Sequence, residues 1–267
     1  MAEAPTDAWL AGDRYEPYIG RWSKLVAKQF VEWLHAAPDL EWLDIGCGTG
    51  ALSAAVLESA APSGVTGIDP SDAFVAYARA HVVDSRALFR VGDAQELPFD
   101  SDAFDIAVSG LVLNFVPDQQ AAVREVARVL KPGGLAALYV WDYSGKMEML
   151  RYFWDAAVAL DPGAALLDEG KRFPICDPVC LTTLFKDSGF QHVAVCAIDV
   201  TTAFPSFEDY WHPFLGGQGP APTYVMSLGD DRRELLRNRL KDGLRIGPDG
   251  KISLVARAWA VSGRVPK

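Results

Sequence analysis

The sequence predicts an α/β fold with a doubly wound, mostly parallel sheet. Between residues 41 and 141, five segments with the apolar character of buried strands alternate with segments that have helical periodicity. A glycine-rich turn follows the first strand. One acidic residue stands at the end of the second strand, and another stands just after the end of the third strand. Alternating strands and helices favour a parallel sheet with helices on both faces, in which ligands bind at the carboxyl ends of the strands.

The stretch Glu41 to Ala51 reads EWLDIGCGTGA and joins the first strand to the first helix of this pattern. Its glycines let the backbone turn tightly, so that a ligand can lie against the main chain, and the N–H groups of the new helix favour electronegative ligand atoms. Residues 46–51 satisfy the dinucleotide fingerprint G-x-G-x-x-[G/A], and Asp69 follows at about the spacing of a ribose-binding acid. A nucleotide site is predicted, with its ligand still open.

Further motifs narrow the choice of ligand. Asp44 stands just before the first glycine, Gly50 adds a third glycine, and the segments VGDA (91–94) and LKPGG (130–134) follow in order. With these motifs, the span from Trp42 to Trp141 resembles class I S-adenosylmethionine (SAM)-dependent methyltransferases, and specifically the methyltransferase type 11 domain. The resemblance is closest to the small-molecule branch that includes the ubiquinone and menaquinone C-methyltransferases.

The resemblance implies a seven-stranded, Rossmann-like methyltransferase fold with two late strands, 192–200 and 252–262, as an antiparallel edge. At 267 residues and 50% hydrophobic composition, one large domain is the expectation. The predicted organisation is a single class I domain over residues 1–267, with an N-terminal arm and helix (1–38), a SAM-binding core (41–142) and lid-like substrate-side insertions (143–176 and 201–245).

SAM is therefore the implied cofactor and S-adenosyl-L-homocysteine the implied product. Asp69 is placed to accept hydrogen bonds from both ribose hydroxyls. The family pattern assigns Asp93, with the Ala94 backbone, to the adenine ring, and the alternative for Asp93 is an exposed turn residue. The predicted cofactor-binding residues are Tyr18, Arg21, Trp22, Asp44, Gly46, Cys47, Gly48, Asp69, Pro70, Gly92, Asp93, Ala94 and Ser109.

The segment before the first strand combines aromatic and basic residues with a helix predicted to run from Trp9 to Leu34. Residues 13–23 hold three aromatic residues and two arginines. One interpretation is a surface arm whose aromatic residues cover the core. The other, implied by similar methyltransferases, is an arm that folds over the cofactor, where a sulfonium near aromatic faces gains ~1 kcal/mol or more.

The two predicted insertions are rich in aromatic residues. At helical spacing such residues belong more often to a core than to a ligand site. Two aromatic insertions and an aromatic arm would alternatively make a lid that excludes water and binds an apolar or aromatic acceptor. The predicted substrate residues are Asn114, Trp141, Tyr152, Trp154, Tyr210, Trp211 and Phe214.

Methyl transfer from a sulfonium needs alignment more than a large catalytic constellation. If the nucleophile is a phenol, an amine or an acidic carbon, a base assists, and His212 is the histidine that lies within an aromatic insertion. Asp142 and Tyr143, at the end of the fifth strand, are second candidates. If the nucleophile is a carboxylate, no base is needed.

Charge and composition limit the partners. The net charge of −10 argues against nucleic acid, because such binding uses many Lys and Arg contacts to phosphate. No apolar run approaches the ~18 residues of a membrane helix, and no signal peptide is recognisable, so a cytoplasmic monomer or homodimer without a membrane partner is expected. The four cysteines lack clustered histidines, and no metal site is predicted.

Three functional interpretations result. The first is a methyltransferase acting on a small-molecule substrate through an O-, N- or C-nucleophile. The second, supported by the G-x-G-x-x-A match, is an NAD(P)-dependent oxidoreductase, although a Tyr-x-x-x-Lys pair or an evident catalytic Cys or zinc set is missing. The third is a catalytically silent SAM-binding protein, which would have to explain intact cofactor motifs.

Overall fold

A computed structural model of the chain describes residues 19–216 and 219–267. The chain divides into two compact units. The core unit comprises Ser23–Trp141, Ile175–Ile198 and Ala258–Lys267. Among the described residues, the insertion unit comprises those of Asp142–Pro174 and Asp199–Arg257, together with residues 19–22. Tyr15 and Tyr18 of the predicted arm lie outside the described residues.

The core unit is built on a seven-stranded sheet with the order β3-β2-β1-β4-β5-β7-β6. Parallel pairs join β1 to β2 and β4, β2 to β3, and β4 to β5, whereas β7 runs antiparallel to β5. This confirms the predicted doubly wound, mostly parallel fold. The strands are β1 (Glu41–Ile45), β2 (Gly64–Asp69), β3 (Ala87–Val91), β4 (Phe104–Gly110), β5 (Leu130–Trp141), β6 (Gln191–Phe204) and β7 (Ile252–Arg264).

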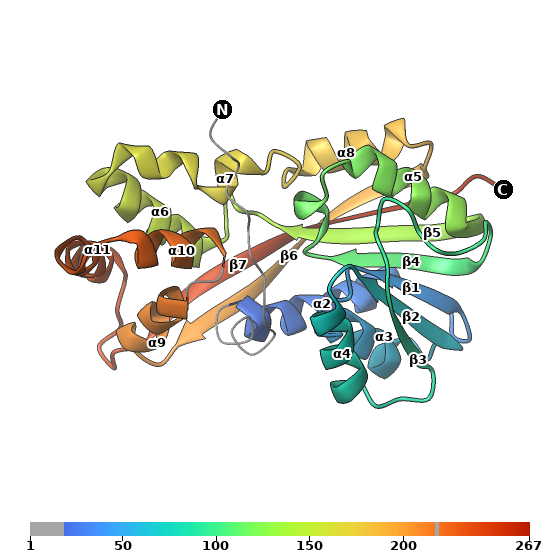
Figure 1. The fold of residues 1–267 in the computed structure, drawn as a ribbon, viewed down its shortest axis with the longest axis horizontal. Coiled ribbons are helices and arrows are strands. Elements are labelled where there is room, and N and C mark those ends of the chain that lie inside the picture. Colours follow the sequence, from blue (N-terminus) through green and yellow to red (C-terminus); the bar gives the residue numbers. More distant parts are fainter. Residues whose placement is uncertain (1–18, 217–218) are drawn as a thin grey trace. The chain divides into compact units, whose positions relative to one another are not determined.

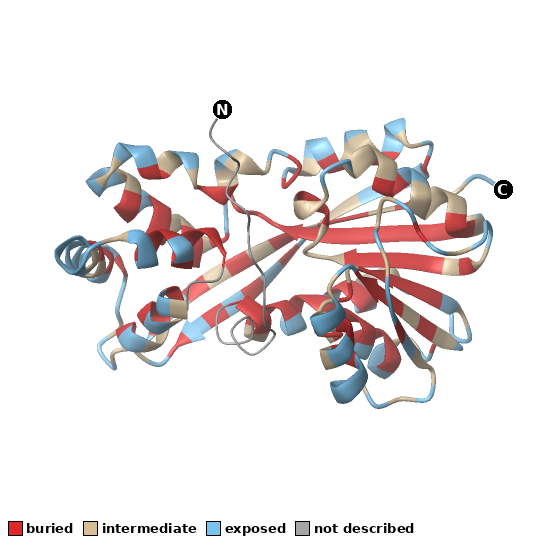
Figure 2. Cartoon of the chain, in the orientation of Figure 1, coloured by how far each residue is buried: buried red, intermediate tan, exposed pale blue. Residues whose placement is uncertain are grey.

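Helices cover both faces of this sheet. In Figure 1, α2, α3 and α4 lie on one face, and α5 and α8 lie on the other. The apolar residues of β1, β4 and β5 are buried along almost their whole length, as expected for strands covered on both sides (Figure 2). The helices are α2 (Arg21–Leu34), α3 (Ala51–Ser59), α4 (Asp72–His81), α5 (Gln119–Val129) and α8 (Pro178–Asp187).

Around the LKPGG segment, α5 passes directly into β5, because α5 ends at Val129 and β5 begins at Leu130. Leu130 pairs with Phe104 across an irregularity in the β4–β5 register. At the other end, Asp118 caps α5, since its side chain accepts the N–H of Ala121 at 2.8 Å.

The insertion unit has its own aromatic core. The rings of Phe153 and Phe214 stack with centroids 4.6 Å apart, and Tyr210 lies 5.5 Å from Phe214. Trp154 packs edge-on against Phe153 at 5.0 Å. These residues come from α6 (Glu148–Leu160), α9 (Phe207–Trp211) and η4 (His212–Gly216); the other helices of the unit are α7 (Glu169–Arg172), α10 (Pro220–Ser227) and α11 (Asp230–Gly243).

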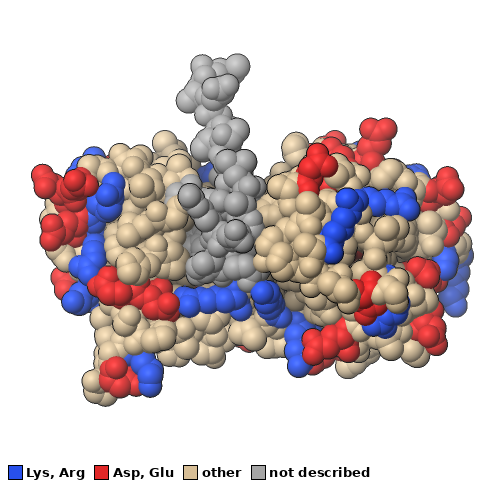
Figure 3. Space-filling view, turned by 60° about the horizontal axis from the view of Figure 1, so that its bottom comes forward, with Lys and Arg blue, Asp and Glu red and all other residues tan. Residues whose placement is uncertain are grey.

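Surface charges are of mixed sign. On the face shown in Figure 3, basic side chains stand next to acidic ones. The arginines of α11 illustrate this, because Arg232 pairs with Asp161, Arg233 with Asp230, and Arg237 with Glu208. Among the described residues, no helix is long and apolar enough to cross a membrane.

A buried acid ties α7 to α6 within the insertion unit. The carboxylate of Glu169 accepts a hydrogen bond from the indole Nε1 of Trp154, and both side chains are buried. Next to Glu169, Asp168 forms an ion pair with Arg151. Burial raises the pKa of the Glu169 carboxyl to about 7, although hydrogen bonds to its ionised form oppose the rise.

We therefore expect Glu169→Gln to stabilise the protein at pH 8 more than at pH 5. An unfolded glutamic acid ionises near ~4.3, so the native state binds more protons between about pH 4 and 7, and wild-type stability falls as pH rises through that window. The gain at pH 8 should be on the order of a few kcal/mol in the free energy of unfolding by denaturant. Asp155→Asn, exposed on α6, is the control. A gain that does not depend on pH would contradict this account.

Candidate functional site

The glycine turn after β1 is fixed to the neighbouring strand. The backbone N–H groups of Gly46 and Cys47 both donate to the carbonyl of Ile68 in β2, each at 2.8 Å. Gly46 has a φ of 72°, and a Cβ there would lie 2.5 Å from the side chain of Val112. Any side chain at Gly46 would therefore displace the segment that follows β4.

Gly48 leaves an open space beside the same turn. Its φ is 50°, and a Cβ at this position would meet no heavy atom of residues 19–216 or 219–267 within 4 Å. Its N–H donates to Oδ2 of Asp69 at 3.0 Å, which joins the turn to the carboxyl end of β2. The open face of Gly48 is the kind of surface against which a ligand can lie close to the main chain.

Asp44 is a fully buried acid at the end of β1. One carboxylate oxygen, Oδ2, accepts a 2.6 Å hydrogen bond from Ser53 Oγ on α3, whereas Oδ1 is buried without a hydrogen-bond partner among the described residues. Burial raises the pKa of Asp44 to about 7, and the nearby charge of Asp69 adds to the rise. An unpartnered buried carboxylate oxygen is costly, so this site suits a cationic or hydrogen-bond-donating ligand group.

Asp69 is the last residue of β2 and is hydrogen-bonded to Gly48. Its Oδ1 accepts the N–H of Ser71 at 2.9 Å, and its Oδ2 accepts the N–H of Gly48. Burial raises the pKa of this carboxyl, and the two backbone hydrogen bonds partly offset the effect. Because each carboxylate oxygen can accept a second hydrogen bond, Asp69 retains the capacity to bind ligand hydroxyls.

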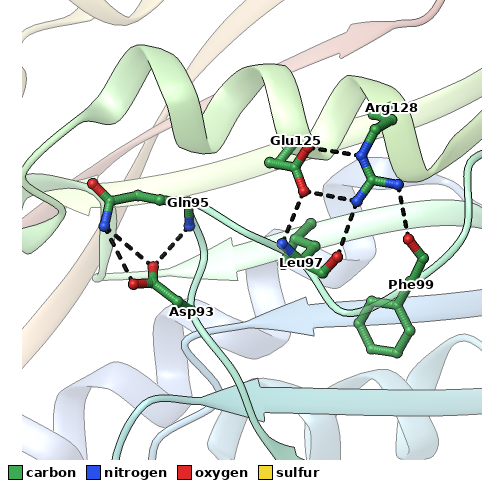
Figure 4. Close-up of polar contacts among 6 residues, drawn as sticks. All are labelled: Asp93, Gln95, Leu97, Phe99, Glu125 and Arg128. Carbon is green, nitrogen blue, oxygen red and sulfur yellow. Dashed lines mark hydrogen bonds and ion pairs between the residues drawn. The ribbon is translucent and has the colours of Figure 1, made fainter.

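The loop after β3 holds Asp93 in a defined orientation. Asp93 is exposed, and its Oδ1 accepts the backbone N–H of Gln95 at 2.8 Å. The amide nitrogen of Gln95 donates to both oxygens of Asp93, at 3.2 and 3.4 Å (Figure 4). Gly92, Ala94 and Pro70 accompany these acids at the carboxyl ends of β3 and β2.

Two predicted polar residues lie on or after β4. Ser109 donates from Oγ to the carbonyl of Ile45 at 2.7 Å, so its hydroxyl links β4 to β1. Asn114 lies in η2 (Leu113–Phe115) and is buried, yet neither its amide oxygen nor its amide nitrogen has a partner among the residues described. Like Asp44, Asn114 presents polar atoms that a bound ligand or water would satisfy.

Several predicted site residues are instead used in packing. The thiol of Cys47 belongs to a cluster with Val75, Ala78 and Phe89, and its backbone N–H is already bonded to Ile68. The indole of Trp154 is bonded to Glu169, and the hydroxyl of Tyr210 donates to the carbonyl of Met149 at 2.9 Å. Trp141, Trp211 and Phe214 are also buried. Tyr152 is intermediate in exposure. The packing alternative thus explains most of the aromatic residues in the insertions.

The three candidates for a base differ in their surroundings. Both carboxylate oxygens of Asp142 accept backbone N–H groups, from Gly145 at 3.0 Å and Lys146 at 2.9 Å, which gives this residue a role in the turn. Tyr143 is buried with its ring 5.9 Å from that of Phe173. His212 follows α9 and is exposed. A catalytic role for any of them stays a prediction.

The described part of the predicted arm makes contacts within the insertion unit. The guanidinium of Arg21 lies 4.5 Å from the ring centroid of Trp22 and 4.9 Å from that of Phe204. Arg21 also forms an ion pair with Asp209 at 3.1 Å. These contacts give Arg21 and Trp22 a packing role, and their part in cofactor binding stays a prediction.

Sequence reasoning missed the partners that hold the acidic residues. Ser53, which bonds Asp44, is a small polar residue in the otherwise apolar start of α3. Glu125 and Arg128 of α5 hold the loop that carries Asp93. Glu125 and Arg128 are three residues apart on one helix, a spacing that predicts an ion pair. The backbone groups that this pair binds depend on tertiary structure, so the sequence does not predict them.

Comparison with known proteins finds similarity over the part of the chain that holds these site residues. Residues 43–138 match the family model described as a methyltransferase domain. The chain is 41% identical over 95 residues to the demethylmenaquinone methyltransferase of Staphylococcus aureus. This match covers 35% of the chain and spans 39% of the relative's length.

Solved structures share the fold across most of the chain. Phosphoethanolamine N-methyltransferase 2 of Haemonchus contortus, in complex with SAM, has a TM-score of 0.57 at 17% identity, covering 96% of this chain and 56% of that one. A SAM-dependent methyltransferase of Thermotoga maritima has a TM-score of 0.55 at 18% identity, with 94% of each chain covered. Together, these findings show that residues 43–138 are similar to a methyltransferase domain, including that of a quinone methyltransferase, and that the chain has the fold of solved methyltransferases.

Proposed function

We propose that this protein is a SAM-dependent methyltransferase that acts on a small, largely apolar or aromatic metabolite. Two features that occur together support it most: the open face of Gly48, and the buried Oδ1 of Asp44, which has no hydrogen-bond partner among the described residues. Both belong to the turn at the carboxyl end of β1, where open α/β sheets bind ligands. A ligand with a cationic group and an extended body fits these two features.

Each acid in the core unit has a distinct part in this proposal. Asp44 accepts a hydrogen bond from the ammonium of the methionine portion, which its free oxygen suits. Asp69 binds ribose hydroxyls with the acceptor capacity that Gly48 and Ser71 leave. Asp93 binds the adenine portion, because its carboxylate is exposed and held by Gln95.

SAM, when bound, supplies an electrophilic methyl group on a sulfonium. The chain itself contributes by binding, by orienting the acceptor and by excluding water, and alignment of reacting groups can supply up to ~7 to 11 kcal/mol of the rate enhancement. The buried amide of Asn114 is a group that would orient a ligand in the core unit. His212 stays the predicted base for an acceptor that needs one.

The acceptor class rests on charge and on the relative. A net charge of −10 disfavours a polyanionic substrate. The Staphylococcus aureus relative is named for demethylmenaquinone, a substrate that supports an apolar or aromatic acceptor for this chain. We include a cytoplasmic location and a monomeric or homodimeric state in the same proposal.

The NAD(P)-dependent alternative accounts for fewer observations. In the dinucleotide-binding fold the strand order is 3-2-1-4-5-6. Here β7 stands between β5 and β6 and runs antiparallel to β5. That arrangement favours a methyltransferase, and the same acids at the strand ends would serve either ligand.

Titration distinguishes the two cofactors directly. We expect isothermal titration to show saturable, one-site binding of SAM and of S-adenosyl-L-homocysteine, and no comparable binding of NADH or NADPH. The reason is that the free oxygen of Asp44 suits an amino group, which the nicotinamide cofactors lack at the corresponding end. Binding of NADH with affinity equal to that of SAM would overturn the proposal.

A glycine substitution tests whether the ligand lies against Gly48. Gly48→Ala should weaken SAM binding at least tenfold, because the added methyl group would fill the space that the ligand needs. Gly189→Ala is the matched control, since Gly189 lies in the same unit, also has a positive φ, 87°, and has no heavy atom of the described residues within 4 Å of the position that a Cβ would take. If both variants bind SAM like wild type, the ligand does not approach Gly48.

The ionisation of Asp44 predicts a pH dependence of binding. Because burial raises its pKa to about 7, the carboxyl is mostly protonated at pH 5.5 and about half ionised at pH 7. SAM affinity should therefore rise roughly tenfold from pH 5.5 to 7, as the carboxylate that pairs with the ammonium forms. Asp44→Asn should bind weakly and without this slope, whereas Asp105→Asn, on β4, should retain it. An affinity of wild type that stays constant over this range would remove Asp44 from the site.

A further inference from the structure

The loop after β3 is held by α5 at two separate points. At its start, the amide oxygen of Gln95 accepts the backbone N–H of Asp118 at 2.9 Å, while the amide nitrogen of the same side chain holds Asp93. Further along, Leu97 and Phe99 are bonded to Glu125 and Arg128 (Figure 4). The loop that carries Asp93 is thus fixed at both ends of residues 95–99.

The Glu125–Arg128 ion pair bonds both backbone polar groups of Leu97, as a neighbouring strand would in a sheet. Glu125 Oε2 accepts the N–H of Leu97 at 2.8 Å, and Arg128 Nη2 donates to the carbonyl of Leu97 at 2.9 Å. Arg128 Nη1 also donates to the carbonyl of Phe99 at 2.8 Å. Within the pair, Nη2 of Arg128 lies 2.7 Å from Oε2 of Glu125. One planar guanidinium therefore fixes two carbonyls and one carboxylate, which a lysine could not do.

The charges of this pair persist over a wide pH range. The hydrogen bond from Arg128 holds the pKa of Glu125 below its usual value, and Glu125 in turn raises the pKa of Arg128. The side chain of Leu97 is buried, whereas Asp93 is exposed. The loop is consequently anchored on the protein side and leaves its acid available to a ligand.

We propose that Glu125 and Arg128 are positioning residues that set the cofactor affinity and its selectivity for adenine by orienting Asp93 through residues 95–99. This inference rests on the proposed function, in which Asp93 binds the adenine portion. Neither residue would contact the cofactor. They would instead lower the free-energy cost of ordering the loop when the cofactor binds, because residues 95–99 already have the bound arrangement in the free protein.

A double-mutant cycle measures this coupling. Arg128→Met should weaken binding of S-adenosyl-L-homocysteine about tenfold in isothermal titration, since it removes the donors to both carbonyls. In the Asp93→Ala background, Arg128→Met should have little further effect, because the residue through which it acts is gone. Arg128→Lys, which retains the charge next to Glu125, should give an intermediate loss and covers the case in which Arg128→Met does not fold.

Selectivity separates positioning from general stability. Wild type should prefer S-adenosyl-L-homocysteine over its inosine counterpart, in which a carbonyl oxygen replaces the adenine amine, and Arg128→Met should lose most of that preference. Lys131→Met is the control, because it removes the 2.8 Å Lys131–Asp105 ion pair in the same unit without touching residues 93–99. It should leave the preference unchanged even if it lowers the melting temperature.

The outcomes are distinct. Additive effects of Arg128→Met and Asp93→Ala, or an unchanged adenine preference in Arg128→Met, would overturn the positioning role and leave the proposed function standing. Failure of wild type to bind S-adenosyl-L-homocysteine would overturn both. The structure predicts that Arg128→Met is coupled to Asp93→Ala and loses the adenine preference. It predicts that Lys131→Met shows neither effect.

Discussion

The carbonyl of Ile68 is the point on which the site depends. It accepts the N–H groups of both Gly46 and Cys47, so one oxygen of β2 fixes the direction in which the chain leaves β1. From this follow the start of α3, the open face of Gly48 and the bond between Gly48 and Asp69. The ladder between β1 and β2 continues to the pair Ile45 and Ile68, so sheet formation itself completes the turn.

Charge distinguishes the centre of the site from its edge. Asp44 is buried, has a raised pKa and has one oxygen without a partner among the described residues, so the free protein bears a free-energy cost that a cationic ligand would relieve. Asp69 has a raised pKa as well, but its two backbone hydrogen bonds favour its charged form. Asp93 is open to solvent and depends on Gln95 for its orientation. Three acids with the same chemistry are thereby suited to three different parts of one ligand.

Much of the core unit could be predicted because its signals are local. The glycine turn and the strand-end acids each depend on a few consecutive residues. The aromatic residues of the insertions gave no such signal, since core and ligand-binding aromatics have the same helical spacing. Only tertiary contacts show that Trp154 bonds Glu169 and that Tyr210 bonds Met149. For the same reason, the sequence does not predict the hydrogen bond from Arg128 to the carbonyl of Leu97, 31 residues away.

The central claim is that the turn between β1 and α3 binds the cofactor through its main chain, together with the acids at the ends of β1, β2 and β3. The measurement that tests it most directly is a crystal structure of the full chain with S-adenosyl-L-homocysteine. The account predicts density against Gly48, with the amino group bonded to Oδ1 of Asp44, the ribose hydroxyls bonded to Asp69 and the adenine next to Asp93. Density for the ligand at any other place, with Asp44 Oδ1 still unpartnered, would contradict it.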